Sequence, residues 1–227
     1  MIQERAGEIL QGIAQEAPEV VVPSIVNELE ESRQKEREEL QFRLINLLGE
    51  FGQAGKGAVP QLIKVLKNGD ERMQFAAMFA LEEIGPAADK AVPELTVRST
   101  HEDPGMRYRA LEALRAIAAD EALAMAVKPA LESDYEETRM MALDIVQDIG
   151  QKAKTTVPLL VKLLEKKELD TSTRERTAAA LGAVGTAEAQ DALIQILKGN
   201  DTSPKVRVAA AEALGELGSA EAERVLI

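Results

Sequence analysis

Two adjacent residues, His101 and Glu102, are the side chains most able to bind a metal ion or to transfer protons. Imidazole and carboxylate groups are common metal ligands, and the same groups serve as catalytic bases and acids. A metal centre or a catalytic triad needs further groups, yet the 227 residues include one histidine and no cysteine. The sequence also lacks the Gly-x-Ser-x-Gly motif of a nucleophilic serine. We therefore predict no metal site and no catalytic residues, and expect His101-Glu102 to lie in a loop before a helix.

A glycine-rich segment, Gly52 to Gly57, is the second candidate, because such a segment can surround a phosphate group. Phosphate-binding loops of this kind follow a β-strand and end in Gly-Lys-Ser or Gly-Lys-Thr. Here a predicted helix precedes the segment, and Gly57 follows Lys56. We predict a turn between two helices and no bound cofactor.

Charged side chains are abundant and mostly acidic. The chain has 39 Asp and Glu against 27 Lys and Arg, a formal net charge of −12. This charge disfavours general binding to nucleic acids and to anionic membranes, both of which attract basic proteins. A local basic set lies on or near predicted second helices: Lys64, Lys67, Lys152, Lys154, Lys162, Lys166 and Lys167. We interpret these lysines as solvated surface residues, with a positive strip for an acidic peptide as the alternative.

Signals for membranes or secretion are absent from the sequence. No apolar run approaches the roughly 20 residues of a membrane span. The opening sequence MIQERAGEIL contains acidic residues and no apolar core of a secretory signal. The absence of cysteine fits a reducing compartment. We expect a cytoplasmic protein with no membrane insertion.

A repeated pattern accounts for more of the sequence than any of these motifs. Its clearest copy is Arg174 to Leu197, which predicts a helix of small residues, a break at Gly185 and a second, apolar helix. The residues that end the successive first helices are Ala14, Gly52, Gly85, Ala118, Gly150, Gly185 and Gly218. These anchors are 38, 33, 33, 32, 35 and 33 residues apart. A period in this range indicates a solenoid of stacked helical pairs.

Other residues recur at fixed distances from the anchor. Arginine stands eleven residues before it at Arg107, Arg139, Arg174 and Arg207. Aspartate stands fifteen residues before it at Asp70, Asp103 and Asp170, where a helix N-cap is expected. Proline stands eight residues after it at Pro60, Pro93 and Pro158, in the first turn of the second helix. In repeat three, helical spacing predicts one apolar face from Phe75, Met78, Phe79, Leu81 and Ile84.

The pattern resembles HEAT-like (armadillo-like) repeats, in the short form also found in phycobilisome-lyase-type proteins. The residues that carry the resemblance most clearly are Asp170, Arg174, Ala178, Ala179, Ala180, Leu181, Gly182 and Gly185. It covers nearly the whole chain and implies that Asp and Arg link adjacent units in a hydrogen-bonded ladder. Gln41 and Gln74 occupy the arginine position in repeats two and three, which predicts an interrupted ladder there. Tetratricopeptide and ankyrin repeats share this period, but their Trp-Leu-Gly-Tyr and Thr-Pro-Leu-His signatures are absent.

The repeat assigns helices along the chain. First helices are predicted at 36–51, 71–84, 104–118, 136–149, 173–184 and 204–217, and second helices at 21–31, 58–67, 90–98, 122–131, 156–166 and 188–198. Incomplete outer units add helices at 4–14 and from 220 onward. We expect an all-α, right-handed solenoid of about seven HEAT-like hairpins, forming a single domain over residues 1–227. The apolar residues 225–227, with no polar capping unit after them, predict that the chain is part of a longer protein.

The resemblance also carries functional expectations. HEAT-like deoxyhypusine hydroxylases hold a di-iron centre with several His-Glu pairs, which His101-Glu102 alone cannot build. HEAT-like DNA glycosylases use a basic groove lined with aromatic residues, whereas this chain is acidic and has no tryptophan. The leading interpretation is a non-enzymatic scaffold that binds a protein, a peptide or other domains of the same chain along its concave surface. The alternatives are a phycobilisome-lyase-type role in bilin attachment, or as its chaperone, and a structural spacer.

The resemblance implies that second helices line the concave surface. The residues expected to project there and contact a partner are Gln61, Lys64, Lys67, Glu94, Lys162 and Glu165.

A core substitution tests the repeat assignment. Leu181→Ala is expected to lower the free energy of unfolding by about 2–5 kcal/mol, because a buried leucine leaves a cavity. Thermal unfolding followed by circular dichroism measures the change. A melting temperature equal to that of the wild type would show that Leu181 is not in the core.

Overall fold

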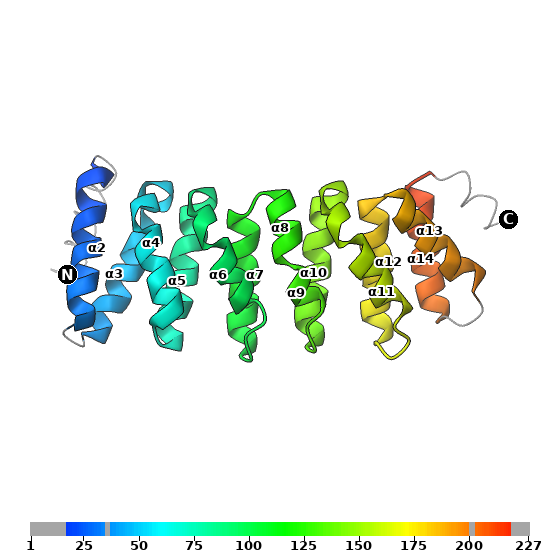
Figure 1. Ribbon diagram of the computed structural model, residues 1–227, viewed down its shortest axis with the longest axis horizontal. Coiled ribbons are helices and arrows are strands. Elements are labelled where there is room, and N and C mark those ends of the chain that lie inside the picture. The colour runs from blue at the N-terminus through cyan, green and yellow to red at the C-terminus, as the bar shows by residue number, and fades with distance from the viewer. Residues whose placement is uncertain (1–16, 35–36, 200–202, 219–227) are drawn as a thin grey trace, which may run out of the picture. The chain divides into compact units, whose positions relative to one another are not determined.

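The computed structural model describes residues 17–34, 37–199 and 203–218, and every regular element within them is a helix (Figure 1). The all-α prediction is therefore confirmed for these residues. The predicted helices at 4–14 and from 220 onward, and the apolar residues 225–227, lie outside the described residues.

The helices form two compact units, Met1–Ala119 and Asp120–Ile227. The first contains α2 (Pro18–Gln34), α3 (Glu38–Glu50), η1 (Gly52–Ala58), α4 (Val59–Asn68), α5 (Glu71–Ile84), η2 (Gly85–Ala91), α6 (Val92–Arg98) and α7 (Pro104–Ile117). The second contains α8 (Asp120–Ala126), α9 (Lys128–Leu131), α10 (Glu136–Ile149), η3 (Gly150–Thr156), α11 (Val157–Glu165), α12 (Thr171–Val184), α13 (Ala187–Lys198) and α14 (Pro204–Glu216). A single domain over residues 1–227 remains a prediction.

Within each unit, hairpins stack on their neighbours. First helices pack in the series α3, α5, α7 and in the series α10, α12, α14, while second helices pack as α4 on α6 and α11 on α13 (Figure 1). The residue four before each anchor is fully buried in these stacks: Leu48, Leu81, Leu114, Val146, Leu181 and Leu214 each have 0% exposure. The helical repeat read from the sequence is thus also the unit of packing.

The anchor glycines have backbone conformations that side chains disfavour. Gly52, Gly85 and Gly150 have φ angles of 52°, 69° and 55°, and each starts a 3-10 helix that leads into the next α-helix. Positive φ favours glycine because it has no Cβ. The predicted turn at Gly52–Gly57 is therefore confirmed as η1. Ala118 differs, since it is extended (φ −81°, ψ 137°), and the division between the two units follows it at Ala119.

The predicted N-caps are confirmed at three aspartates. Asp70, Asp103 and Asp170 accept hydrogen bonds from the backbone N–H of the residue three positions later, at 2.8, 2.8 and 2.7 Å. Each bond satisfies a donor that the first helical turn leaves free. Ser203 occupies the N-cap position of α14 but makes no such side-chain bond.

At three of the arginine positions, the side chain bonds the first helix to the chain segment that precedes it. Arg107 Nη1 donates to the carbonyl oxygens of His101 and Glu102, at 2.8 and 2.7 Å. Arg139 Nη1 donates to Ser133 O at 2.8 Å, and Arg174 Nε donates to Leu164 O at 3.1 Å. A buried guanidinium thereby satisfies carbonyl groups that no helix uses.

Glutamine makes the same kind of bond in the two N-terminal repeats. Gln74 Nε2 donates to Gly69 O at 2.7 Å, and Gln41 Nε2 donates to Ser32 O at 3.2 Å. An amide thus replaces the guanidinium as the donor to the backbone, while the interruption of the Asp–Arg ladder in these two repeats stays a prediction. An ion pair of 3.6 Å between Arg139 and Asp170 additionally joins two consecutive repeats.

Most predicted helix boundaries lie within two residues of the observed ones, and two predictions need correction. The helix expected at 122–131 is divided into α8 and α9 around Val127. Pro129 follows in the first turn of α9 and has no N–H for a continuous helix. Pro23, expected in the opening turn of a helix at 21–31, lies inside α2, which starts at Pro18.

Close approach of consecutive first helices generates a stability prediction. A Cβ at Gly182 of α12 would lie 2.6 Å from the Cβ of Ala213 in α14, closer than packing allows. Gly182→Ala is therefore expected to reduce the free energy of unfolding by about 1–3 kcal/mol, as overpacking does. Chemical denaturation measures the change.

Gly215, at the equivalent place in α14, is the matched control. It is exposed, and a Cβ there would have no neighbour within 4 Å. Gly215→Ala is expected to leave stability unchanged or raise it by up to about 1 kcal/mol through helix propensity. Equal effects of both substitutions would contradict the close approach.

The Asp170 cap generates a prediction of pH dependence. Partial burial opposes its ionisation, but hydrogen bonds from Thr173 and the charge of Arg139 lower the pKa of Asp170 from its ordinary 3.8. The ionised carboxylate therefore stabilises the fold above about pH 4, and this stabilisation is lost as the pH falls through the lowered pKa. Asp170→Asn keeps a capping oxygen and removes the charge. We expect it to lower the melting temperature at pH 7 and to make a smaller difference at pH 3. A difference that does not depend on pH would refute the contribution of the charge.

Candidate functional site

The charged residues expected to meet a partner lie on second helices of both units. They are Lys64 and Lys67 of α4, Glu94 of α6, and Lys162 and Glu165 of α11. We call this set the second-helix residues. Four of them are well exposed, and Glu94 is partly buried. Partner contact by these residues stays a prediction.

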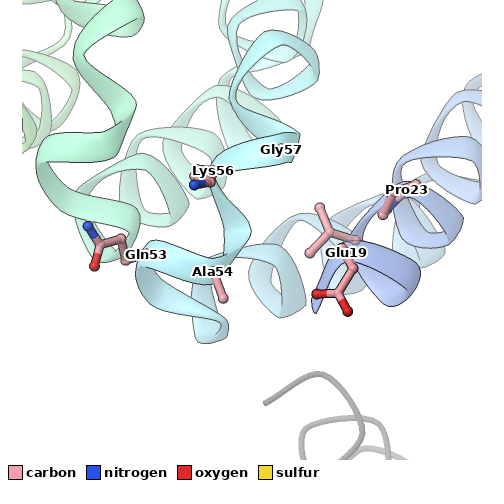
Figure 2. Close-up of a pocket in the computed structure, with 7 residues that line it drawn as sticks. Glu19, Pro23, Gln53, Ala54, Lys56 and Gly57 are labelled. Carbon is pink, nitrogen blue, oxygen red and sulfur yellow. The ribbon is translucent and has the colours of Figure 1, made fainter. Parts of the chain in front are cut away.

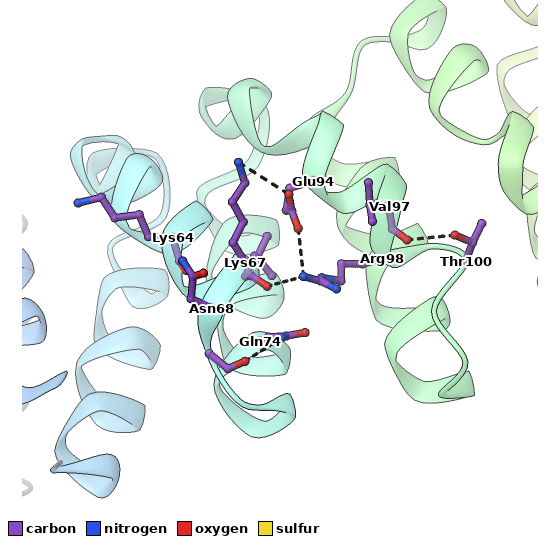
Figure 3. Close-up of polar contacts among 10 residues, drawn as sticks. Lys64, Lys67, Asn68, Gln74, Glu94, Val97, Arg98 and Thr100 are labelled. Atoms are coloured by element: carbon purple, nitrogen blue, oxygen red, sulfur yellow. Dashed lines mark hydrogen bonds and ion pairs between the residues drawn. The ribbon is translucent and has the colours of Figure 1, made fainter.

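In the first unit, the second-helix residues pair with charges on neighbouring helices. Lys64 Nζ lies 2.9 Å from Glu30 Oε1 of α2, and Lys67 Nζ lies 4.0 Å from Glu94 Oε2. Glu94 Oε1 also accepts a hydrogen bond of 3.1 Å from Arg98 Nη2, which donates in addition to Leu66 O at 2.8 Å (Figure 3). The charges on α2, α4 and α6 thus form links between successive repeats.

The second unit has a comparable pair of opposite charges between repeats, with a longer distance than that of Lys64 and Glu30. Lys162 Nζ of α11 lies 3.7 Å from Glu132 Oε1, which follows α9, and the two side chains are 64% and 56% exposed. Exposed pairs of this kind contribute only about 0–1 kcal/mol to stability. Both members are therefore available to an external partner at little cost to the fold.

Gln61 does not belong to this surface. Its side chain is only 3% exposed, and its Nε2 has no hydrogen-bond partner in the described structure. The reason is its place on α4, four residues before the buried Val65 and beside the buried Leu62. The expectation that Gln61 projects toward a partner is therefore corrected.

His101 and Glu102 have structural contacts. His101 Nδ1 accepts a hydrogen bond of 3.1 Å from the backbone N–H of Asp103, which caps α7. The backbone carbonyl oxygens of His101 and Glu102 both accept hydrogen bonds from the guanidinium of Arg107. No group of three or more His, Cys, Asp or Glu side chains that could hold a metal ion occurs within residues 17–34, 37–199 and 203–218.

A hollow of about 680 Å³ lies between α2 and η1 (Figure 2). Glu19 and Pro23 of α2 form one side, and Gln53, Ala54 and Lys56 of η1 form the other. Among the described residues that line it, Glu19 and Lys56 carry charge, and they do not form a constellation of groups suited to catalysis.

Sequence reasoning missed an aromatic surface on the first helices of the first unit. Phe75 and Phe79 were expected on the buried face of α5 with Met78, but each is 40% exposed, whereas Met78 is fully buried. The two phenylalanines are four residues apart and share the helix face opposite the core. The sequence did contain a signal for this surface: an aromatic residue recurs every 33 residues, at Phe42, Phe75 and Tyr108.

These phenylalanines border a hollow of about 440 Å³, which we call the first-helix groove. Its walls are Phe42, Asn46, Glu71, Arg72, Phe75, Ala76, Phe79, Asp103 and Met106. The groove therefore crosses α3, α5 and the start of α7, all in the first unit.

Arginines stack on the phenylalanine rings. The guanidinium carbon of Arg72 lies 4.0 Å from the centre of the Phe42 ring, and Arg72 Nη2 donates to Glu39 Oε2 at 3.0 Å. Arg43 Nε donates to the other oxygen of Glu39 at 3.1 Å. The hydrogen bonds from Arg72 and then from Arg43 hold the pKa of Glu39 below its ordinary value. One carboxylate is thus shared by two arginines.

Arg109 of α7 makes a related contact on the next repeat. Its guanidinium carbon lies 5.3 Å and 5.5 Å from the ring centres of Phe75 and Phe79. Its Nη1 donates to Glu82 Oε2 at 2.6 Å. Arginine over the ring of a half-buried or exposed phenylalanine is therefore a recurring feature of this surface.

Comparison with known proteins identifies the repeat. Residues 157–227 match the family model described as HEAT repeats. This segment consists of HEAT repeats. The helices before this segment share part of its pattern: Asp70 and Asp103 cap first helices as Asp170 does, and Gly52, Gly85 and Gly150 have positive φ as Gly185 does. No curated protein matches the sequence.

Two solved structures are similar. Human deoxyhypusine hydroxylase in complex with glycerol is 20% identical, with a TM-score of 0.51 over 93% of this chain and 78% of that chain. The complex of CpcE and CpcF of phycocyanin lyase from Nostoc sp. PCC7120 is 22% identical, with a TM-score of 0.41 over 95% of this chain and 85% of that chain. The hydroxylase shares the fold, and neither comparison assigns a function.

None of the described helices is both long and apolar enough to cross a membrane.

Proposed function

We propose that this chain is a non-enzymatic scaffold that binds a protein or peptide partner. The observation that supports it best is the exposure of Phe75 and Phe79, each 40%, beside a groove that Arg72 borders. Folding gives no reason to leave two large aromatic side chains in water, because burying them would stabilise the chain. Aromatic residues and arginine are also the types that dominate protein interfaces.

The chemistry of the described residues supports a binding role more than a catalytic one. The only histidine of the chain, His101, uses its ring nitrogen and its carbonyl to organise the start of α7. A hydroxylase-like metal centre would require several such residues. We propose the cytoplasm as the compartment, in keeping with the absence of cysteine.

The second-helix residues remain a proposed second contact, on the concave side implied by HEAT-like repeats. Lys64 and Lys162 lie in different units and have similar exposure, 56% and 64%. In the described structure Lys64 pairs with the exposed Glu30, and Lys162 pairs with the exposed Glu132. An acidic residue of a bound protein can displace either glutamate from its lysine.

Charge reversal tests this contact. Lys64→Glu combined with Lys162→Glu is expected to weaken an acidic partner about tenfold or more, since it converts two attractions into repulsions. The melting temperature should change little, because exposed ion pairs contribute about 0–1 kcal/mol. Partners are recovered by cross-linking and mass spectrometry, and their affinities are then measured by calorimetry.

The matched control is Lys90→Glu with Lys205→Glu, which changes the net charge equally at exposed lysines outside second helices. Equal losses of affinity in both double variants would remove the second-helix residues from the interface. The scaffold proposal itself would fail if the wild-type chain retained no partner or turned over a substrate.

A further inference from the structure

The first-helix groove combines apolar and charged groups in a small space. Phe42, Phe75 and Phe79 supply its aromatic surface, and Ala76 and Met106 complete the apolar lining. Its volume of about 440 Å³ is near the lower end of ligand-binding pockets. A groove of this size accommodates a large side chain from a peptide with its immediate neighbours.

Arg72 is held in position at the edge of this groove. One face of its guanidinium rests on the Phe42 ring at 4.0 Å, and Nη2 is bonded to Glu39 at 3.0 Å. Because the side chain is fixed by these two contacts, less conformational entropy is lost when it binds a further group. It is nevertheless 54% exposed, and its described bond to Glu39 uses only one of its nitrogens. The remaining N–H donors are suited to a carboxylate.

Glu71 and Asp103 are the acidic residues that line the groove, and Glu39 lies beside it, bonded to Arg72. Asp103 Oδ1 is occupied by the backbone N–H of Met106, as the cap of α7. Glu39 is neutralised by Arg72 and Arg43 together, so these three residues carry a net positive charge. Glu71 is exposed at the start of α5. The positive group nearest the Phe42 ring is therefore Arg72.

Building on the proposed scaffold function, we propose that the first-helix groove binds a short peptide segment of a partner. The segment places an aromatic or long aliphatic side chain against Phe42, Phe75 and Phe79. It places the side-chain carboxylate of a nearby Asp or Glu against Arg72. The aromatic contact supplies the apolar burial, and the arginine fixes the register of the peptide.

Selection of displayed peptides tests this proposal. The full chain is used to select from random peptides fused to phage through their C-termini, so that any carboxylate selected belongs to a side chain. We expect enriched peptides to share an aromatic or long aliphatic residue with Asp or Glu close to it. A synthetic consensus peptide should lose about tenfold or more in affinity for Phe75→Ala and for Arg72→Gln, as interface hot spots do. A selection repeated on Arg72→Gln should no longer favour the acidic residue.

Two controls separate the groove from general surface effects. Arg43→Gln removes an arginine that also bonds Glu39 but does not line the groove. Val208→Ala changes an exposed apolar residue, 56% exposed, on α14 of the other unit. Each should alter peptide affinity by about twofold or less, as surface substitutions do. Melting curves of all four variants confirm that they are folded.

The outcomes distinguish this inference from the scaffold proposal. Enriched peptides that bind Phe75→Ala as tightly as the wild type, or that carry Lys or Arg in place of the acid, would overturn the groove inference. The absence of any enriched peptide would also overturn it. If a protein partner is still retained, and is lost on reversing Lys64 and Lys162, the scaffold proposal stands without the groove. If the chain retains no partner at all, both fail.

Discussion

The glycine that ends a first helix is the constraint on which the hairpin depends. At Gly52, Gly85, Gly150, Gly185 and Gly218 the backbone takes a positive φ, between 52° and 69°. At Gly52, Gly85, Gly150 and Gly185 the first helix ends and the chain reverses within a few residues. Because each reversal follows a buried leucine, or Val146 in the case of Gly150, by four residues, the next second helix starts at a defined place beside its first helix. Packing of one hairpin on the next then follows from the period of the sequence.

The two kinds of helix consequently present different chemistry to solvent. Second helices carry pairs of opposite charge that connect neighbouring repeats, such as Lys64 with Glu30. First helices of the first unit carry aromatic rings under arginine, such as Phe42 under Arg72. Exposed charge pairs exchange partners easily and contribute little to stability, whereas exposed rings favour contact with another molecule. The described first and second helices of the first unit therefore present two surfaces of distinct chemical character.

The architecture was predictable from sequence because its determinants are local. Positive-φ glycine, N-cap aspartate and first-turn proline each act within a few residues, so their spacing reproduced most helix boundaries. The surface was less predictable, because it depends on which helix face meets a neighbour. Gln61 looked like a surface residue by its polarity and is buried, while Phe75 looked like a core residue and is 40% exposed. Helical spacing had placed Phe75 on the buried face, and the resemblance had placed Gln61 on the concave surface. Both were misassigned because burial here depends on which helix face meets a neighbouring helix.

The donors at the arginine position also show how the repeat tolerates change. Gln41 and Gln74 donate an N–H to the chain segment before their helix, as Arg107 and Arg139 do elsewhere. Arg139 also pairs with Asp170 of the next repeat. Part of what holds each of these first helices in place is therefore encoded next to it in the sequence. Gene duplication or deletion of whole repeats could lengthen or shorten such an array without redesign of the remaining hairpins. In this chain, aromatic residues recur at equivalent places in three successive first helices, at Phe42, Phe75 and Tyr108. Copying of a hairpin would therefore copy such an aromatic position as well, so that a longer array would carry a longer row of aromatic side chains.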